Sequence, residues 1–393
     1  MAKKQLLALF FCNLIIWSLG NGLVPLLPVY AATLGTTPAV IGYYMAASYL
    51  AMALGTIATG RLVEWVGSYK RLLFGSGVIC APAIGLMGQA TNTGQLVALT
   101  MLVWFLVGVI VALLNIVAGL SVDPAQRGRI FGIIFLSVPL GALAGGATLG
   151  ALADWGGYST MFLAMALVWL GLPVGSAFFL TESETPHRSP RSRSLNATPL
   201  ILNRRFAPVF LATILSSVTI FMGRLGTSLS MESLHFTSTL VSSTAAVGGL
   251  IALPVIPLLG LLSDRVGRRG LLVLLYITAT LGVLVLNSAS ALWHFWLAAS
   301  LLSISAYGNG TLSAALANDL LSRESLNRGL SLFSSTMWIA GIIGFASTGY
   351  LLDHLGPPVV FIGGACLPIL ATGLLWSTRS DRERPTPQVQ PVR

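Results

Sequence analysis

Charged residues are scarce in this chain of 393 residues, and their scarcity decides the class of protein. Asp, Glu, Lys and Arg make up 9% of the sequence, whereas hydrophobic residues make up 55%. Soluble domains carry about 25% charged residues, so a water-soluble globular fold is excluded. Disordered chains combine low hydrophobicity with high net charge, so disorder along the whole chain is excluded as well. The composition indicates a membrane protein.

Cysteine and the usual catalytic groups are also sparse. The three cysteines, Cys12, Cys80 and Cys366, lie far apart in apolar stretches, so they form neither a disulfide framework nor a metal-ligand spacing. None of the twelve Asp and Glu residues falls in the middle of a predicted membrane span. No nucleophile with a nearby base is recognisable, and no phosphate loop of the form G-x-x-x-x-G-K followed by Ser or Thr. We therefore expect neither an enzyme nor an ATP-driven pump, and no metal or cofactor.

The net charge of +10 is explained by membrane orientation rather than by nucleic-acid binding. Apart from Arg224, the basic residues form seven clusters, separated by six apolar stretches of about 45–65 residues. Each stretch is long enough for two membrane helices of about 20 residues. With a cytoplasmic amino terminus, 21 of the 22 basic residues lie on the cytoplasmic side, as the positive-inside rule requires. We expect a multi-pass protein of the bacterial inner membrane or plasma membrane, with both termini cytoplasmic.

The predicted fold is all-α, with twelve transmembrane helices arranged as two six-helix bundles. The first bundle covers residues 1–180 and the second covers residues 206–377. The segment 181–205 is polar, basic and proline-containing, so we expect a cytoplasmic linker, and residues 378–393 are expected to form a cytoplasmic tail. The predicted spans are 5–29, 38–62, 72–90, 96–120, 129–152, 160–180, 206–231, 239–262, 270–288, 291–317, 329–351 and 357–377.

Three sequence features recur about 200 residues apart. Residues 60–67 match residues 260–267, Arg127-Gly128 matches Arg328-Gly329, and residues 150–154 match residues 349–353, with offsets of 200, 201 and 199. Such a repeat predicts two halves of the same topology, related by an axis along the membrane normal.

The second copy of the repeat carries a family resemblance. The segment 260–269, GLLSDRVGRR, resembles the signature of the major facilitator superfamily for the loop between helices 2 and 3 and for its repeat between helices 8 and 9. Arg328-Gly329 fits the start of helix 11 in the same family, and residues 22–30, GLVPLLPVY, are similar to the first helix of its drug-efflux branch. The resemblance implies a secondary transporter that works by rocker-switch alternating access.

The resemblance also implies a cytoplasmic gate. In such transporters the signature cluster latches the cytoplasmic side when the protein faces outward, and small residues such as Gly60 and Gly260 let helices approach closely. Asp123 and Asp319 are expected to join the same charge network, together with Arg127 and Arg328. A role in topology alone, or as solvated loop residues, is the alternative. The candidate gating residues in the two copies are Gly60, Glu64, Gly67, Gly260, Asp264, Arg265, Gly267 and Arg268.

Arg224 is the clearest candidate for substrate binding. It lies about two-thirds along the seventh predicted span, where a charged residue costs roughly 2.5–3.5 kcal/mol on insertion scales. The matching region of the first span contains Asn21 between two glycines, so both sites are predicted to line a cavity. The alternative for Arg224 is a structural pair with Glu232, eight residues further on and near the outer end of the span.

Several neutral groups are further candidates for the same site. Asn115 and Asn309 occupy comparable places in the two halves and can bind substrate or join helices, and Tyr307 lies two residues before Asn309. Trp17 can stack on an aromatic substrate or pack in the core.

The leading hypothesis for function is export of a drug-like or amphipathic organic compound, with membrane lipids and a coupling proton or ion as further partners, by a chain that works as a monomer. Proton-driven exporters of the family would have Arg at position 104 and Pro at position 142, but this chain has Trp104 and Ala142, which argues against proton/drug antiport. An organic-anion carrier that uses Arg224 is the alternative. A membrane-embedded enzyme or a non-transporting sensor is less favoured.

Overall fold

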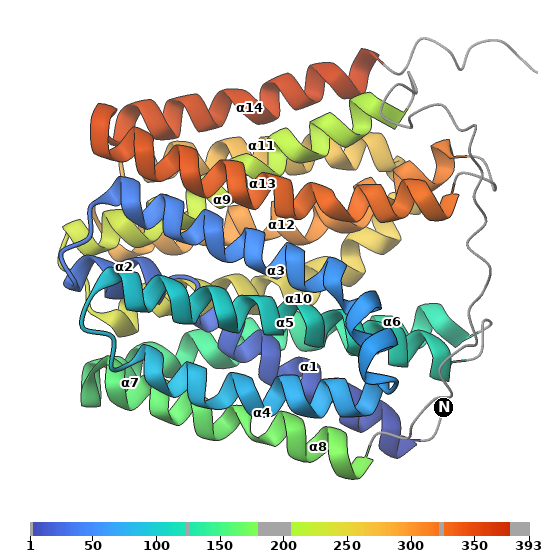
Figure 1. The fold of residues 1–393 in the computed structure, drawn as a ribbon. Coiled ribbons are helices and arrows are strands. Elements are labelled where there is room, and N and C mark those ends of the chain that lie inside the picture. The colour runs from blue at the N-terminus through green and yellow to red at the C-terminus, as the bar shows by residue number, and fades with distance from the viewer. Residues whose placement is uncertain (1–2, 123–125, 180–205, 322–325, 378–393) are drawn as a thin grey trace, which may run out of the picture.

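The structure is a computed structural model that describes residues 3–122, 126–179, 206–321 and 326–377. The predicted linker and tail therefore lie outside the described residues. Every element in the described part is an α-helix, which confirms the predicted fold class. The helices are long and run side by side, and α1 begins and α14 ends at the same end of the molecule (Figure 1). We call this end the termini face and the opposite end the far face.

The helices of the first half follow the predicted spans closely: most of their bounds lie within a few residues of the predicted ones. They are α1 (Lys3–Leu23), α2 (Leu26–Thr33), α3 (Pro38–Val66), α4 (Tyr69–Met87), α5 (Thr93–Ser121), α6 (Arg127–Phe135), α7 (Ser137–Trp169) and α8 (Gly171–Phe179). The second half contains α9 (Phe206–Ser233), α10 (Ser238–Val266), α11 (Arg268–Asn287), α12 (Leu292–Leu320), α13 (Leu326–Leu355) and α14 (Pro357–Ser377).

These helices make twelve membrane crossings. Within the described ranges, ten helical stretches are long and apolar enough to cross a membrane. One of them, Ile130–Phe178, contains two crossings, because the chain turns at Gly157, where φ is 76° and ψ is 173°. α12 adds the twelfth crossing: it has the 29 residues of α5 but a more polar sequence. The chain is therefore a multi-pass membrane protein with the predicted number of spans.

The internal repeat is visible in the helix bounds. α3 and α10 both have 29 residues, and their first residues, Pro38 and Ser238, are 200 positions apart. α5 and α12 also both have 29 residues, and they start at Thr93 and Leu292, which are 199 positions apart. The two halves of the chain thus share one topology.

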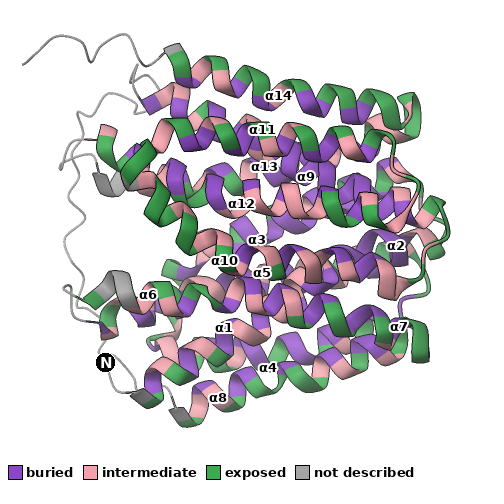
Figure 2. Cartoon of the chain, turned by 180° about the vertical axis from the view of Figure 1, so that it is seen from behind, coloured by how far each residue is buried: buried purple, intermediate pink, exposed green. Residues whose placement is uncertain are grey.

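Buried residues lie between the helices, and exposed residues cover the outside of the bundle (Figure 2). Many of the exposed side chains are large and apolar, such as Ile57, Leu163 and Phe178, each of which is more than half exposed. In a membrane these side chains contact lipid tails, which is why their exposure is compatible with a stable fold.

The two halves meet at the far face, along two pairs of helices. α3 lies against α13, where Gly42 packs on the backbone of Phe345 and Gly349. α7 lies against α10, where Gly150 packs on Ser238. Glycine permits these close approaches because it has no Cβ atom. The far face is therefore closed.

The termini face is open between the halves. A Cβ atom placed on Gly60 of α3 or Gly260 of α10 would have nothing within 4 Å. Trp65, near the end of α3, is 86% exposed. The predicted close approach at these two glycines is therefore absent from this conformation.

Candidate functional site

A cavity between the two halves contains three of the predicted site residues. Asn21, Arg224 and Tyr307 line it together, and they come from α1, α9 and α12. The cavity has a volume of about 70 Å³, and since one water needs about 10–15 Å³, several waters fit into it. The remaining lining residues are Val24, Pro25, Ala142, Thr227, Thr244, Ala245, Gly248, Gly249, Ala299, Leu302 and Ser303. We call this space the central cavity.

Among the described residues that line the central cavity, Arg224 is the only one with a charged side chain. Its guanidinium carbon lies 5.7 Å from the centroid of the Phe221 ring, a distance at which a cation is attracted by the ring face. Tyr49 and Tyr307 are close enough for the charge of Arg224 to act on their hydroxyl groups. Aromatic rings and hydroxyls, rather than a carboxylate, therefore surround this cation.

The proposed structural pair between Arg224 and Glu232 does not form. Among the described residues no ion pair joins them, and Glu232 lies outside the central cavity. Eight residues of α-helix correspond to about 12 Å along the axis, so both groups can share a face without touching. Two glycines lie close to Arg224 in α9: Gly223 packs on Leu302 and Gly226 packs on Phe361. These two glycines permit close helix packing beside the arginine.

Asn21 has an unsatisfied donor. Its Nδ2 atom is buried and has no hydrogen-bond partner in the described part of the chain. A buried donor without a partner is costly, which is typical of a group that a ligand or a water satisfies. Asn21 lines the central cavity and also a second cavity.

The second cavity lies inside the first half and is apolar. It has a volume of about 60 Å³, and α1, α3, α4, α5 and α7 form its walls. Trp17, a predicted site residue, lies in the wall together with Trp104 and Trp169. The indole nitrogen of Trp169 donates a hydrogen bond to the carbonyl of Gly77 at 3.1 Å, which fixes that ring. The other lining residues are Ile16, Leu19, Gly20, Asn21, Leu23, Val24, Tyr49, Met52, Ile84, Val103, Val107 and Met165. We call this space the apolar chamber.

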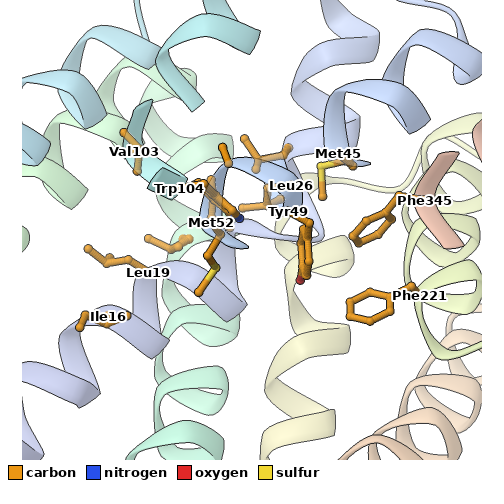
Figure 3. Close-up of a cluster of buried hydrophobic side chains, with 14 of the residues drawn as sticks. Ile16, Leu19, Leu26, Met45, Tyr49, Met52, Val103, Trp104, Phe221 and Phe345 are labelled. Carbon is orange, nitrogen blue, oxygen red and sulfur yellow. The ribbon is translucent and has the colours of Figure 1, made fainter. Parts of the chain in front are cut away.

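Tyr49 stands where the two halves meet. Figure 3 shows it between Trp104 and Met52 on one side and the rings of Phe221 and Phe345 on the other. Its ring centroid is 5.2 Å from that of Phe221 and 5.0 Å from that of Phe345. Tyr49 therefore connects the wall of the apolar chamber to the surroundings of Arg224.

The two asparagines that were predicted to occupy comparable places in the two halves, Asn115 and Asn309, have different surroundings in the structure. Asn309 is buried; it donates to Ser217 Oγ at 3.1 Å and accepts from Ser313 Oγ at 2.9 Å, which is the helix-joining role. Asn115 is exposed and lines neither cavity. Because α5 and α12 start 199 positions apart, Asn309 corresponds to Ile110 (309 − 199 = 110) and not to Asn115. The predicted equivalence of the two asparagines is wrong.

The gating candidates lie at the termini face, where two of them make turns. Gly67 ends α3 with φ at 72°, and Gly267 lies between α10 and α11 with φ at 85°. Glycine adopts this left-handed region without strain, so the signature needs glycine at both positions. Glu64 and Arg265 are exposed.

A charge pair joins two helices of the second half at the same face. Arg268 forms a salt bridge with Asp319 and also donates to the carbonyl of Ala315 at 2.8 Å. Asp319 is thus paired with the signature segment itself. Asp123 and the side chains of Asp264, Arg127 and Arg328 lie outside the described residues, so their predicted roles stay predictions.

Sequence reasoning missed several polar residues of the central cavity, among them Thr244 and Ser303. Thr244 Oγ1 bonds to the carbonyl of Val241 at 2.7 Å, as hydroxyl groups commonly do inside a helix. A hydroxyl that satisfies itself locally gives no sequence signal of a binding role.

The chain resembles known membrane transporters in sequence and in fold. A model of the Major Facilitator Superfamily matches residues 6–231 and residues 209–392. The chain is 27% identical over 288 residues to Multidrug resistance protein MdtG of Serratia proteamaculans, covering 69% of this chain and 68% of that protein. It is 25% identical over 351 residues to the Multi-drug resistance efflux pump PmrA homolog of Lactococcus lactis, covering 84% of each.

Solved structures of transporters share the fold at low sequence identity. A mutant of the nucleoside transporter NupG matches with a TM-score of 0.80 and 12% identity, covering 95% of this chain and 99% of that chain. The matches to the family model, one for each half, agree with the repeat and with the twelve crossings. The chain is a membrane transporter rather than an enzyme, and it belongs to the Major Facilitator Superfamily.

Proposed function

We propose that this protein is a secondary transporter that exports small amphipathic organic compounds by alternating access. The observation that carries the proposal is the central cavity, which contains Arg224, Asn21 and Tyr307 between the two halves at membrane depth. The two halves are in contact at the far face, at Gly42 and Gly150, and Gly60 and Gly260 at the termini face have open space around them. We therefore expect the cavity to be reached from the termini face. The relatives named as multidrug resistance and efflux proteins support export.

The basic clusters support the orientation. The positive-inside rule places them, and with them the termini face, in the cytoplasm, so the conformation described here faces inward. A compound from the cytoplasm enters between the halves, and the halves then rock about the central cavity. In the outward-facing state the contacts of α3 with α13 and of α7 with α10 separate, and the signature segments around Gly60 and Gly260 close the cytoplasmic side.

An organic anion is the second candidate substrate, because Arg224 has no carboxylate beside it in the central cavity. A carboxylate, sulfonate or phosphate on the substrate would form a charge-assisted pair with the guanidinium. Coupling to a proton or another ion belongs to the same proposal. The cavity lining contains no Asp or Glu to carry a proton, so a coupling proton would bind elsewhere.

Transport by purified protein in liposomes tests both candidates. The panel contains aromatic anions, neutral amphipathic compounds and cationic dyes, each offered to wild type, Arg224→Ala and Arg224→Lys. Loss of anion transport alone in Arg224→Ala, with partial recovery in Arg224→Lys, supports the anion carrier. Transport of neutral or cationic compounds by all three supports the broad exporter.

Asn115→Ala is the matched control, because Asn115 is exposed and lines neither cavity; it is expected to transport like wild type. Failure of the wild-type protein to move any member of the panel would refute the export proposal.

A further inference from the structure

We propose that the apolar chamber in the first half is a binding subsite for an aromatic body of the substrate, while an anionic end of the same molecule lies at Arg224. This inference rests on the proposed transport function and narrows its substrate class to aromatic organic anions. The chamber and the central cavity share Asn21 and Val24 in their walls, so they adjoin each other.

The chemistry of the chamber fits an aromatic group. Its wall contains the rings of Trp17, Trp104, Trp169 and Tyr49, and no charged side chain. Aromatic rings pack favourably on one another in offset or edge-to-face arrangements. Trp169 is fixed by its hydrogen bond to Gly77, so part of the wall is preformed.

The junction between the two spaces requires a hydrogen-bond acceptor. The unpartnered Nδ2 of Asn21 is buried there, and Tyr49 lies both in the chamber wall and close to Arg224. A ligand that fills the chamber, accepts from Asn21 and ends in an anion at Arg224 would remove an empty apolar space and an unsatisfied donor together. The neighbouring cation and apolar chamber thus select for an amphipathic anion.

Binding of two probes with the same anionic group tests this subsite. The probes are 1-naphthalenesulfonate, which carries an aromatic body, and methanesulfonate, which does not. Val107→Phe places a ring in the chamber wall and is expected to weaken naphthalenesulfonate binding at least about tenfold and to leave methanesulfonate binding unchanged. Leu102→Phe, on the same helix but exposed, is the matched control and is expected to bind both probes like wild type.

The outcomes separate the subsite from the transport function. Unchanged naphthalenesulfonate binding in Val107→Phe, or no binding to wild type at millimolar concentration, overturns the subsite, and transport by the wild-type protein in liposomes is unaffected by either result. If Val107→Phe lowers the melting temperature and loses both probes, Ile84→Phe fills the chamber from α4 and decides the matter by the same comparison.

At the far face, a carboxylate of the first half contacts the start of a helix of the second half. The carboxylate of Asp154 in α7 accepts hydrogen bonds from the first backbone N–H groups of α10, from Ser238 N at 2.9 Å and from Thr239 N at 2.8 Å, and from Thr239 Oγ1 at 2.5 Å. The first N–H groups of a helix have no partner within it and carry its positive dipole end. A residue of the first half thus caps a helix of the second half.

We infer that Asp154 is a latch that holds the far face closed and must release α10 before the transporter opens outward. Ser242 Oγ donates to the carbonyl of Gly146 at 2.7 Å in the same helix pair, so the latch adds to an existing contact between the halves. Asp353 is the residue that corresponds to Asp154 in the second half. It has no matching role, because the residue that corresponds to Ser238 is Pro38 at the start of α3, and proline lacks an N–H group. Asp353 is exposed and makes no hydrogen bond in the described residues.

Labelling of a cavity residue from outside the cell tests the latch. Thr244→Cys, in a Cys366→Ser background, places a thiol in the central cavity and removes the exposed native cysteine. With a membrane-impermeant maleimide outside, Asp154→Asn is expected to raise the labelling rate several-fold, because the carboxylate is lost. Asp353→Asn is expected to label like the parent, and equal rates for all three proteins, with Asp154→Asn folded by its melting temperature, would overturn the latch.

Discussion

Replacing Gly42 by Ala is expected to shift the transporter toward the outward-facing conformation. Gly42 lies near the start of α3, at the far face. A Cβ atom there would come within 2.6 Å of the Phe345 carbonyl oxygen and 2.7 Å of Gly349 Cα, both in α13. These are backbone atoms of the other half, so no side chain can turn away to make room. The clash exists only while the two halves are in contact.

The size of the effect follows from the geometry. Ordinary contact for a Cβ atom begins at 3.4 Å, so the helices must separate by about 0.8 Å (3.4 − 2.6). Overpacking of this kind typically costs about 1–3 kcal/mol. Since the outward-facing conformation does not bear the cost, the equilibrium between the two conformations shifts by a factor of about 5–150.

Distances between spin labels at the far face measure this shift. Thr91→Cys and Ser288→Cys label exposed positions in the two halves, in a Cys366→Ser background. Gly42→Ala is expected to increase the population of the longer distance. Gly55→Ala is the matched control on the same helix, because Gly55 packs against Phe105 of α5, within the first half. It should lower the melting temperature without changing the distances. Unchanged distances in Gly42→Ala would refute the assignment of this contact to the closed far face.

Three further predictions concern single polar groups. Asn309→Ala is expected to lower the melting temperature, because the loss of buried hydrogen bonds to Ser217 and Ser313 costs about 1–3 kcal/mol. Its transported compounds should stay the same, and an altered substrate range would assign Asn309 to the binding site instead. Asp319→Asn is expected to lower the free energy of unfolding by under about 1 kcal/mol, as measured by thermal unfolding. The reason is that the side chains of the salt bridge are partly exposed, Arg268 at 34% and Asp319 at 41%. A larger loss would contradict that reasoning.

The third of these concerns pH at the far face. Asp154 lies between the predicted spans 129–152 and 160–180. Partial burial acts to raise the pKa of its carboxyl group. Hydrogen bonds from Thr239 and Ser238 outweigh that effect and hold the pKa below its ordinary value of 3.8. A lowered pKa in the closed state means that the latch is fully present at neutral pH and is lost as pH falls through the lowered value. The population of the longer distance between the Thr91 and Ser288 spin labels is therefore expected to rise below about pH 4, and the rise should be absent in Asp154→Asn.

The membrane architecture was predictable because the bilayer imposes its own period on the sequence. The basic clusters must stay outside the lipid, and the intervals between them therefore measure pairs of spans. This is why α14 runs over Pro357–Ser377, as the predicted span 357–377 has it, and why α3 and α10 begin 200 residues apart. Arg224 was recognisable as a candidate site residue for the same reason, since a charge at membrane depth needs a specific surrounding, and the structure places it in the lining of the central cavity.

Neutral residues carried no such signal. Asn115 and Asn309 look alike in sequence. In the structure Asn115 is exposed, whereas Asn309 forms hydrogen bonds with Thr213, Ser217 and Ser313. Glycines pose the same difficulty: Gly42 lies in a tight contact between the halves, and Gly60 has open space around it. Under the proposed alternating-access mechanism, which glycine is packed depends on which face of the transporter is closed, so the sequence alone does not tell the two glycines apart. The apolar chamber was missed because its residues are those of any membrane-helix core.

The position of Arg224 leads to a consequence for the transport cycle if the substrate is an anion. In the inward-facing state, water from the open side can solvate the guanidinium, but during the change to the outward-facing state the central cavity must close on both sides. An unpaired charge at membrane depth then costs roughly 2.5–3.5 kcal/mol, which slows the passage of the empty protein by a factor of about 70–400. A bound anion removes this cost. Exchange of external for internal anion in liposomes should therefore be much faster than net efflux, and Arg224→Gln should reduce that difference; equal rates of exchange and net efflux in the wild type would show that Arg224 does not control the crossing of the empty carrier.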